Sequence, residues 1–380
     1  MKTEEQKRRP SKKFRAHTKP SKGPSADALG LQSGSKTGGF AASGPGTVVR
    51  IGVIGFGYWG PNLVRNFQDL DRSKVVAVAN LQGSALTPLA KRYPAIRLTT
   101  NHQEILKDET VDAVVIATPV STHFELAQAA LQAGKHVLVE KPLAASSAEG
   151  SELIDLARRK KRILMVGHTF EYNPAVLKVA ELLKSQELGE LYYIDSVRVN
   201  LGRYQSDGRN VVWDLAPHDL SIILHWVGKM PERISAFGQA YLQKGTADVA
   251  FIRMEFPEGI LAHVHLSWLA PAKIRRMTVV GSKKMVLYDD LDPSEKLKIA
   301  DRGAHLDANS TEVRIDYRMG DVVSPHLDFK EPLKTECEHF LESILENRLP
   351  RTDGENGNRV VRILEAADQS MREGGKVISL

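Results

Sequence analysis

The chain has 380 residues, of which 42% are hydrophobic and 26% charged, a composition typical of a globular protein with room for two domains. No run reaches the roughly eighteen apolar residues that a membrane-spanning helix needs, and the N-terminus lacks the apolar segment of a secretory signal. The single cysteine, Cys337, excludes an intramolecular disulfide and favours a cytoplasmic location.

Residues 1–47 carry the positive charge of the chain. They hold ten Lys and Arg against three Asp and Glu, so this segment has a net charge of +7 and the remainder −1. It is rich in Gly and Ser and poor in large apolar side chains, which predicts a disordered basic tail. A nucleic-acid-binding arm and a cleaved transit segment are the alternatives. Because the folded body is not basic, we expect neither a nucleic-acid nor a membrane partner.

Residues 48–60, VVRIGVIGFGYWG, join a short apolar run to the pattern G-x-G-x-x-G. Apolar residues then recur at helical spacing, and this order of strand, glycine turn and helix favours a dinucleotide-binding site over an ordinary glycine-rich turn. Gly55 would allow the tight turn, Gly57 would let the backbone approach a pyrophosphate, and Gly60 would let helix and strand pack closely. The helix N-terminus would offer free N–H groups to the phosphates.

Strands and helices alternate as far as residue 168. Strands are predicted at residues 74–80, 111–118, 136–140 and 163–167, and helices at 85–92, 101–107, 121–133 and 147–161. Repeated βα units of this length predict a doubly wound parallel sheet. Residues 48–168 are therefore expected to form a Rossmann NAD(P)-binding domain.

The pattern changes in residues 169–380. Helices at 175–185 and 217–226 are set among strands at 191–200, 233–242, 248–256, 260–269, 277–280 and 284–288, and helices at 333–347 and 357–373 close the chain. The turn chemistry of residues 257–259, Pro-Glu-Gly, predicts a hairpin. Runs of strands this long predict an α+β domain with an antiparallel or mixed sheet.

Asn80 stands about twenty residues beyond the glycines, where an acid usually meets the adenosine ribose. A neutral amide can bond a ribose hydroxyl but does not repel a 2′-phosphate. Since no Arg follows at once, NAD is the expected cofactor and NADP the alternative. His123 is expected to line the same cleft or to cap a helix.

Lys141 follows a parallel strand at the edge of the sheet where ligands bind in such folds. There it could stabilise a developing alkoxide. The alternative is an ordinary solvated lysine.

Residues 213–219, WDLAPHD, would open a helix with Pro217 in its first turn. Asp214 and His218 are four residues apart and could share a face. A neutral His218 near a helix N-terminus could act as a base, or Asp214 could be a cap and His218 a satisfied polar residue. No cysteine or acid stands at a ligand spacing from His225, His263 or His265, so no metal site is expected.

Together these segments resemble the Gfo/Idh/MocA family (glucose–fructose oxidoreductase, inositol dehydrogenase and their relatives). The resemblance covers about residues 48–375 and rests on GFGYWG, ATPVSTH (117–123), GKHVLVEKPLA (134–144), VGHTFEYNPAV (166–176) and WDLAPHDLSI (213–222). It implies a Rossmann domain followed, in residues 169–380, by a substrate-binding and oligomerisation domain with a large, open, mostly antiparallel sheet. That sheet commonly forms subunit contacts, so a homo-oligomer, dimer or tetramer, is expected.

The resemblance also implies roles for individual residues. The catalytic positions fall on Lys141, Asp214 and His218: His218 would take the alcohol proton, Lys141 would hold the same oxygen, and Asp214 would support and orient. Pro142 is expected to follow a cis bond. The implied cofactor contacts are Gly55, Phe56, Gly57, Tyr58, Trp59, Gly60, Asn80, Thr118, Pro119, His123, Glu140, Lys141 and Pro142.

The implied reaction is NAD(P)-dependent hydride transfer from a secondary alcohol of a sugar, nucleotide-sugar or cyclitol. The sequence motifs are most similar to those of family members that act on nucleotide sugars. The expected substrate contacts are His168, Tyr172, Arg198, Asn200, Arg203 and Arg209. The arginines could bind a carboxylate or diphosphate, or form an exposed basic loop. Glu171 stands where many relatives have Arg, so the substrate contacts at this position would differ from those of the relatives. The alternative function is a non-catalytic or redox-cycling cofactor-binding protein on the same fold.

Overall fold

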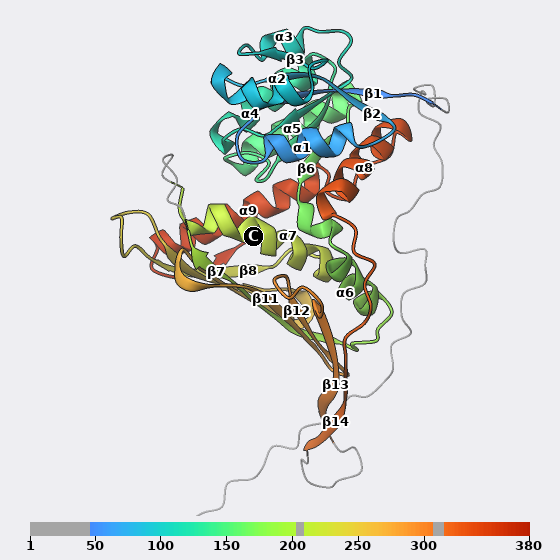
Figure 1. Cartoon of the computed structure of the whole chain (residues 1–380). Helices are drawn as coiled ribbons and strands as arrows, with labels where there is room; N and C mark the ends of the chain where they lie inside the picture. The colour runs from blue at the N-terminus through green and yellow to red at the C-terminus, as the bar shows by residue number, and fades with distance from the viewer. Residues whose placement is uncertain (1–45, 203–208, 307–314) are drawn as a thin grey trace, which may run out of the picture. The chain divides into compact units, whose positions relative to one another are not determined.

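The computed structural model describes residues 46–202, 209–306 and 315–380 (Figure 1). The described residues belong to one compact unit. The predicted basic tail falls almost entirely outside them. Within the described ranges no helix is long and apolar enough to cross a membrane.

The first half of the chain builds a six-stranded parallel sheet. Its strands are β1 (Val49–Ile54), β2 (Ser73–Ala79), β3 (Arg97–Thr99), β4 (Ala113–Ile116), β5 (His136–Glu140) and β6 (Leu164–Gly167). They are bonded in the order β3-β2-β1-β4-β5-β6, with every pair parallel. The predicted doubly wound Rossmann sheet is confirmed. The three residues of β3 are too few to show a strand pattern, which is why it was not predicted.

Helices cover both faces of this sheet (Figure 1). On one face lie α1 (Gly60–Gln68), α2 (Thr87–Arg92) and α8 (Pro332–Leu345), and on the other α3 (Gln103–Leu106), α4 (His123–Gln132) and α5 (Ser147–Lys160). Leu333, Cys337 and Phe340 of α8 are buried in one core with Phe67 of α1. The boundary at residue 168 thus separates the two sheets in sequence, but a C-terminal helix returns to the first sheet.

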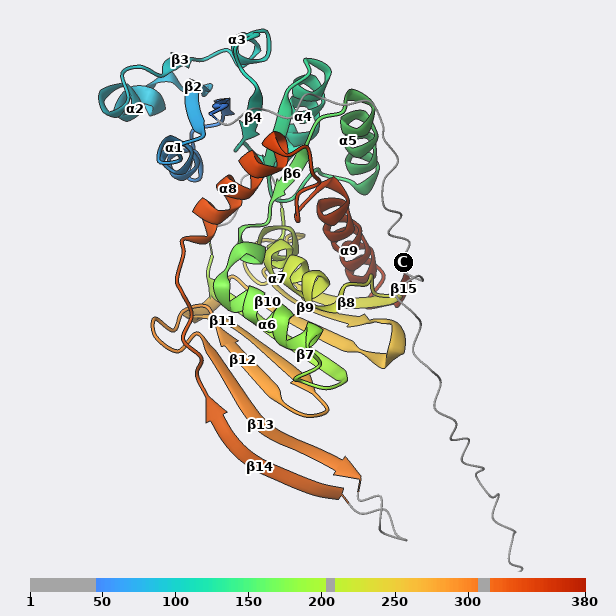
Figure 2. The same cartoon turned by 90° about the vertical axis from the view of Figure 1, so that its right-hand side faces the viewer.

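The second sheet has nine strands. They are β7 (Leu191–Leu201), β8 (Arg233–Gln239), β9 (Val249–Glu255), β10 (Leu261–Ser267), β11 (Leu269–Gly281), β12 (Met285–Asp289), β13 (Leu297–Leu306), β14 (Ile315–Val323) and β15 (Ile378–Ser379). Their order is β14-β13-β12-β11-β7-β10-β9-β8-β15, and β7 with β10 is the parallel pair in a mostly antiparallel sheet. β9 and β10 form the predicted hairpin. Figure 2 shows β13 and β14, which were not predicted, side by side at one edge.

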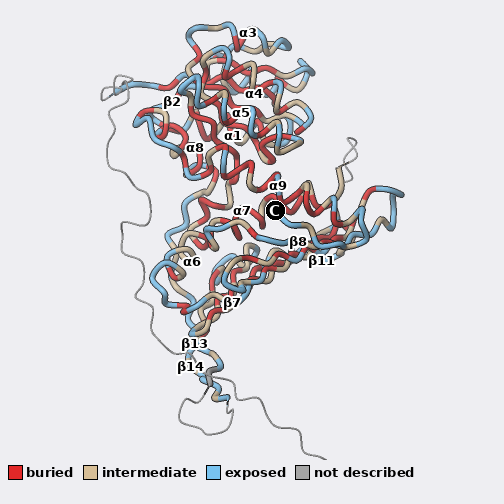
Figure 3. The backbone as a smooth tube through the Cα atoms, turned by 180° about the vertical axis from the view of Figure 1, so that it is seen from behind, coloured by how far each residue is buried: buried red, intermediate tan, exposed pale blue. Residues whose placement is uncertain are grey.

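Three helices cover one face of the second sheet (Figure 1). They are α6 (Pro174–Lys184), α7 (Val211–Val227) and α9 (Gly354–Arg372). Ile194, Ile252 and Val264 point into the core that they share. On the opposite face Tyr193 and Phe251 are exposed, and the alternation of buried and exposed residues is visible in Figure 3. The sheet is therefore open on that side, as expected for an antiparallel sheet with one covered face.

Helix α7 begins earlier than predicted. The Oδ1 atom of Asn210 accepts the backbone N–H groups of Val212 and Trp213, so Asn210 supplies the N-cap. Pro217 lies inside the helix and not in its first turn. The prediction was wrong because proline is common at a helix start, but here the start signal is Asn210. The proline has no N–H to donate to the carbonyl four residues earlier, so this turn of the helix is interrupted.

Candidate active site

The glycine loop follows β1 at the edge of the parallel sheet. Gly55 has a φ of +98°, and a Cβ there would lie 2.3 Å from the carbonyl oxygen of Ala117. At Gly60 a Cβ would lie 2.6 Å from the carbonyl oxygen of Gly55. Both positions therefore need glycine for backbone reasons. At Gly57 a Cβ would meet nothing within 4 Å, which leaves open space beside the loop.

The loop leads into the start of α1, where no acidic side chain would compete with a bound phosphate. Trp59 occupies the N-cap position without a side-chain cap, and the first turn of α1 holds no acidic residue. Tyr58 is 89% exposed and its ring contacts that of Trp59. Pro61 has no N–H and the backbone N–H of Asn62 donates to the carbonyl of Trp59, so the N–H groups of residues 57–60 remain for a bound phosphate.

Asn80 braces the loop. Its Oδ1 accepts the backbone N–H of Phe56 at 3.0 Å, and its Nδ2 donates to the carbonyl of Gln82 at 3.0 Å. The amide thus joins the ends of β1 and β2. A structural task of this kind explains why an amide, with one acceptor and one donor, suits the position.

A pocket of about 610 Å³ opens beside Asn80 and the glycine loop. Charged side chains are scarce around it: Glu125 is the charged residue among its described lining, which includes no Lys or Arg. Its lining residues are Ile54, Gly55, Phe56, Gly57, Ala79, Asn80, Leu81, Gln82, Ala85, Thr100, His102, Gln103, Ala117, Thr118, Pro119, Thr122, Glu125, Leu126 and Ala129. Its size and its position beyond the carboxyl ends of the strands suit the adenosine half of a dinucleotide.

His123 lies behind this pocket as a brace. Its Nδ1 is 2.8 Å from the carbonyl oxygen of Pro142, and its Nε2 is 2.8 Å from that of Thr118. Burial lowers the pKa of His123, so the ring is neutral at pH 7 and donates to one of the two carbonyls. The side chain thus lies between the loops that follow β4 and β5 and is hydrogen-bonded to one of them.

Lys141 projects from the end of β5 toward α7. Its Nζ donates to the backbone carbonyl of Asp214 at 3.1 Å, and the peptide bond to Pro142 is cis, as predicted. Burial lowers the pKa of Lys141, while the carboxylates of Asp214 and Glu140 oppose that shift. The lysine is thus no ordinary solvated side chain.

Glu140 is buried on the other side of the same strand end. A Cβ at Gly167 of β6 would lie 3.1 Å from its carboxyl group, so the two are in close contact. Burial raises the pKa of Glu140 to about 7, although the neighbouring charge of Lys141 opposes this. A buried carboxyl therefore stands close to the ammonium group of Lys141.

The side chains of Asp214 and His218 on α7 each meet a different aromatic residue. The carboxylate of Asp214 accepts the indole N–H of Trp268 at 3.0 Å. His218 instead packs against Phe170, with ring centroids 5.0 Å apart and planes at 73°. Burial, helped by the charges of Lys141 and Arg198, lowers the pKa of His218 well below its ordinary value. The neutral imidazole thus owes its state to burial and cations, since the earlier start of α7 removes the expected helix-end effect.

Arg198 is placed differently from the sequence-based expectation. Its guanidinium forms two hydrogen bonds to Asp219, at 2.8 and 2.9 Å, and its side chain is 3% exposed. Arg275 of β11 is its register partner across the sheet and lies within 3.5 Å of Asp290. Arg198 therefore serves a buried ion pair with α7, whereas Arg275 forms a partly exposed pair with Asp290.

The other predicted substrate contacts are dispersed. His168 is buried near Lys141, and its two ring nitrogens have no hydrogen-bond partner among the described residues. Tyr172 lies in the core, where its hydroxyl contacts that of Thr352 at 3.1 Å. Asn200 and Arg209 are half-buried, and Arg209 adds positive charge near Lys141. Arg203 lies outside the described residues.

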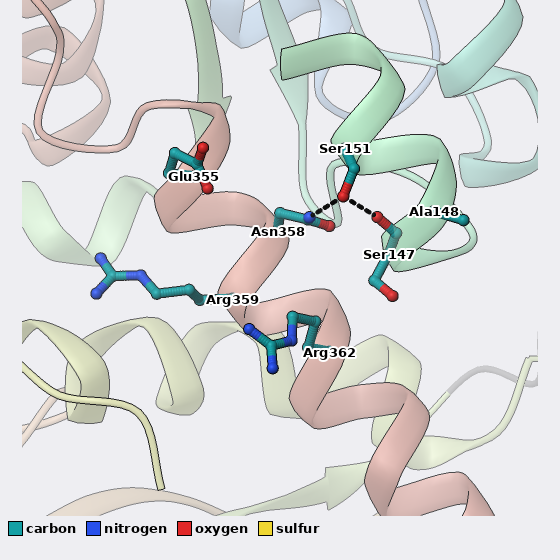
Figure 4. A pocket seen from close by; sticks show the side chains of 7 residues that line it. All are labelled: Ser147, Ala148, Ser151, Glu355, Asn358, Arg359 and Arg362. Carbon is teal, nitrogen blue, oxygen red and sulfur yellow. Dashed lines mark hydrogen bonds between the residues drawn. The ribbon is translucent and has the colours of Figure 1, made fainter. Parts of the chain in front are cut away.

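A second pocket, of about 400 Å³, lies between α5 and α9 (Figure 4). Asn358 donates to the hydroxyl of Ser151, which in turn donates to the carbonyl of Ser147. The lining residues are Ser147, Ala148, Ser151, Glu355, Asn358, Arg359 and Arg362. The pocket shares no residue with the group around Lys141. Over the described ranges no group of three or more His, Cys, Asp or Glu residues could hold a metal ion.

A six-stranded Rossmann sheet with a glycine loop, joined through Lys141 to a helix that carries a neutral histidine, defines a nicotinamide-dependent oxidoreductase. Comparison with known protein families agrees with this class of protein. Residues 49–168 match the model described as the oxidoreductase family with an NAD-binding Rossmann fold, and residues 176–287 match the GFO/IDH/MocA C-terminal domain. The chain belongs to the Gfo/Idh/MocA family.

Several known proteins are similar over most of the chain. UDP-N-acetylglucosamine 3-dehydrogenase from Acidithiobacillus ferrooxidans is 29% identical over 82% of this chain and 94% of its own length. The solved structure of that enzyme, GnnA, has a TM-score of 0.72 and covers 85% of this chain and 97% of the other. The uncharacterised oxidoreductase YdgJ of Escherichia coli is 30% identical over 67% of this chain and 75% of its length. A more distant relative, 22% identical over 74% of this chain and 78% of its length, is the 2,7-anhydro-N-acetylneuraminate hydratase of Escherichia coli.

The cofactor of the enzyme is NAD, as the family and the residues of the pocket agree. The open space at Gly57 would admit a pyrophosphate, and no side-chain cap at the start of α1 would compete with it. Phe170, Trp268 and Arg275 had not been singled out as neighbours of the catalytic group. Trp268 and Arg275 lie far in sequence from the glycine and Lys141 motifs, and the pairing of β7 with β10 and β11 brings them near. Phe170 lies in the short turn after β6, where no local pattern shows that its ring meets His218.

Proposed function

We propose that this enzyme oxidises a secondary alcohol of a sugar or nucleotide sugar. The observation that carries the proposal is the contact between Lys141 of the Rossmann sheet and the backbone of α7 at Asp214, which brings an ammonium group and the neutral His218 to one place. The similarity to UDP-N-acetylglucosamine 3-dehydrogenase supports a nucleotide sugar as the substrate class.

In the proposed mechanism His218 takes the proton of the reacting hydroxyl. Its lowered pKa keeps the imidazole neutral and ready to accept that proton. Lys141 Nζ donates a hydrogen bond to the same oxygen and stabilises the negative charge that develops there. Bound NAD⁺ would supply the hydride acceptor, and the glycine loop and the pocket beside Asn80 would hold it. The carbonyl of Asp214 orients Lys141, and Trp268 holds the Asp214 carboxylate in place.

The first experiment is a substrate panel. The purified enzyme is incubated with NAD or NADP and UDP-sugars, GDP-sugars, free hexoses, uronic acids or inositols, and the absorbance of the reduced nicotinamide is followed. A rise with one class identifies the substrate. Absence of any rise, together with absence of bound nucleotide in the denatured protein, contradicts the proposal.

Two variants test the assigned roles. We expect Lys141→Met and His218→Ala to lower kcat by about 10²–10⁴-fold, the usual contribution of a positioned acid or base. His218→Ala should still bind NAD, which fluorescence titration measures. His326→Ala is the matched control, because that histidine is exposed and distant in sequence from the group. Full activity in both active-site variants would refute the mechanism.

A redox-cycling enzyme is the second candidate, favoured by the similarity to a hydratase. In that case hydride returns to the substrate, and no reduced cofactor accumulates. NAD that remains bound through purification, with product formed but no lasting absorbance change, would support this alternative.

We also propose that the open face of the second sheet joins two copies of the chain. Its exposed side chains include Tyr193, Phe251 and Leu261, more apolar surface than water-facing strands need. Light scattering measures the oligomeric state, and Phe251→Glu should shift it to monomer if this face is the interface. A cytoplasmic location stays the expectation from the single, buried, free cysteine.

A further inference from the structure

The 3₁₀ turn η4 (Thr169–Tyr172) is anchored from the C-terminal side of the chain. The hydroxyl of Thr169 donates to Glu336 of α8 at 2.7 Å, Asn356 of α9 donates to the carboxyl of Glu171 at 3.2 Å, and Tyr172 contacts Thr352. The residues of η4 itself lie between the two segments that match the family models. Three of the four residues of η4 are thus held by polar contacts to the segment that carries α8 and α9.

The fourth residue, Phe170, faces α7. Its ring lies 5.0 Å from the His218 ring at 73°, the edge-to-face arrangement that aromatic pairs favour. The guanidinium carbon of Arg198 lies 4.8 Å from the centroid of the same ring. Arg198 in turn holds Asp219, the residue next to His218 on α7. Phe170 therefore contacts the imidazole and the ion pair that fixes the neighbouring residue.

Among the described residues no hydrogen bond orients the ring of His218. Its Nδ1 is buried and lacks a partner within the described part of the chain, and the carboxylate of Asp214 is engaged by Trp268. In many enzymes a carboxylate or carbonyl on the second nitrogen fixes the tautomer and direction of a catalytic histidine. Here packing has to do this, and Phe170 is the aromatic ring in contact with the imidazole.

We propose that Phe170 is a positioning residue for His218: presented by the anchored turn η4 and backed by the Arg198–Asp219 ion pair, it sets the direction of the imidazole and excludes water from it. The proposal rests on the proposed role of His218 as base. Charged and titratable groups near His218 come from several elements. They are Lys141 after β5, His168 after β6, Arg198 of β7, Arg275 of β11, and Asp214 and Asp219 of α7. Substitution of Phe170 leaves each of these charged and titratable groups in place, although it removes the contact of the ring with Arg198.

The test compares Phe170→Leu with Phe340→Leu in the full chain. Phe340 of α8 is also buried and also makes an edge-to-face contact, with Phe67 at 6.3 Å, but lies in the core beneath the first sheet. The readouts are kcat and KM, the pH profile of kcat/KM, thermal stability, and the NMR titration of the His218 ring, whose signal the His218→Ala spectrum assigns.

We expect Phe170→Leu to lower kcat by about tenfold, part of the 10²–10⁴-fold that a general base contributes, with the KM for NAD changed less than about twofold. Water admitted to the imidazole should raise its titration midpoint and move the acid limb of the pH profile upward with it. Phe340→Leu should lower the melting temperature and leave both midpoints unchanged.

An unchanged His218 titration and an unchanged kcat in folded Phe170→Leu would overturn the proposal. If that variant fails to fold, Phe170→Met, which keeps apolar volume without the ring, is measured in the same way. The NMR titration needs no turnover, so it decides the role of Phe170 separately. Full activity of His218→Ala, by contrast, would refute the proposed function.

Discussion

Removal of the Arg198 side chain tests whether this residue binds substrate or stabilises the fold. The Arg198 and Asp219 side chains are 3% and 2% exposed, and two hydrogen bonds join them. Arg198→Met keeps the apolar length of the side chain but leaves the Asp219 carboxylate buried without its cation. Breaking a buried pair in this way costs about 3–5 kcal/mol, a large part of the roughly 5–15 kcal/mol that stabilises a typical domain.

The assay is urea unfolding followed by circular dichroism. Arg50→Met is the control, because the Arg50–Asp112 pair has side chains 44% and 35% exposed and should contribute no more than about 1 kcal/mol. The double variant Arg198→Met with Asp219→Leu removes both charges and should recover most of the lost stability. A loss below about 1 kcal/mol in Arg198→Met, combined with a raised KM for the sugar, would refute this reasoning and support the original substrate-binding prediction.

The other predictions concern the cofactor site and a buried acid. Gly57→Ala should leave the melting temperature unchanged but weaken NAD binding, since the added Cβ fills only the open space, whereas Gly55→Ala should destabilise the fold because of its φ of +98° and the 2.3 Å approach to a carbonyl. NAD should be used at least about tenfold more efficiently than NADP because the pocket lining offers no cation, and Leu81→Arg at its edge should raise the use of NADP. Burial raises the pKa of Glu171 to about 8, so stability should fall between pH 4.5 and 8, and Glu171→Gln should flatten this slope.

Each of these has a measurement that can contradict it. Equal NAD affinity in Gly57→Ala, by fluorescence titration, would mean that the pyrophosphate lies elsewhere. Equal kcat/KM for the two cofactors would show that other groups accept the 2′-phosphate. For Glu171 the sign follows from linkage: the folded state binds a proton that the unfolded state has already lost above pH 4.5. Melting temperatures of Glu171→Gln that track the wild type from pH 5 to pH 9 would show that another group sets the slope.

The Rossmann half could be predicted well because its signals are local. The glycine pattern, the apolar strands and their order in the chain are read within a few residues of one another, and the structure confirms the sheet that they predict. The cis bond before Pro142 was also predicted, through the family resemblance. The start of α7 was misplaced because Pro217 looks like a first-turn residue when the cap at Asn210 is overlooked.

The surroundings of the predicted catalytic residues could not be predicted in the same way. An arginine on a strand has the same appearance in sequence whether it meets a substrate phosphate or a buried aspartate such as Asp219. The partner of Asp214, Trp268, is 54 residues away along the chain. Which side chain meets which is decided by the pairing of β7 with β10 and β11, and that long-range register leaves no local pattern.

The return of α8 to the first sheet bears on how the protein is made. Leu333, Phe340 and Leu341 are each at least nine-tenths buried, and burial of each such side chain stabilises by about 1.5–3 kcal/mol. A ribosome that has released only residues 48–168 has therefore synthesised a nucleotide-binding sheet with one uncovered apolar flank. That sheet can be completed only after strands β7 to β14 of the second sheet have emerged. Nascent chains of this enzyme should thus depend on chaperones until synthesis ends, and a fragment cut at residue 168 should aggregate unless α8 is supplied as a separate peptide.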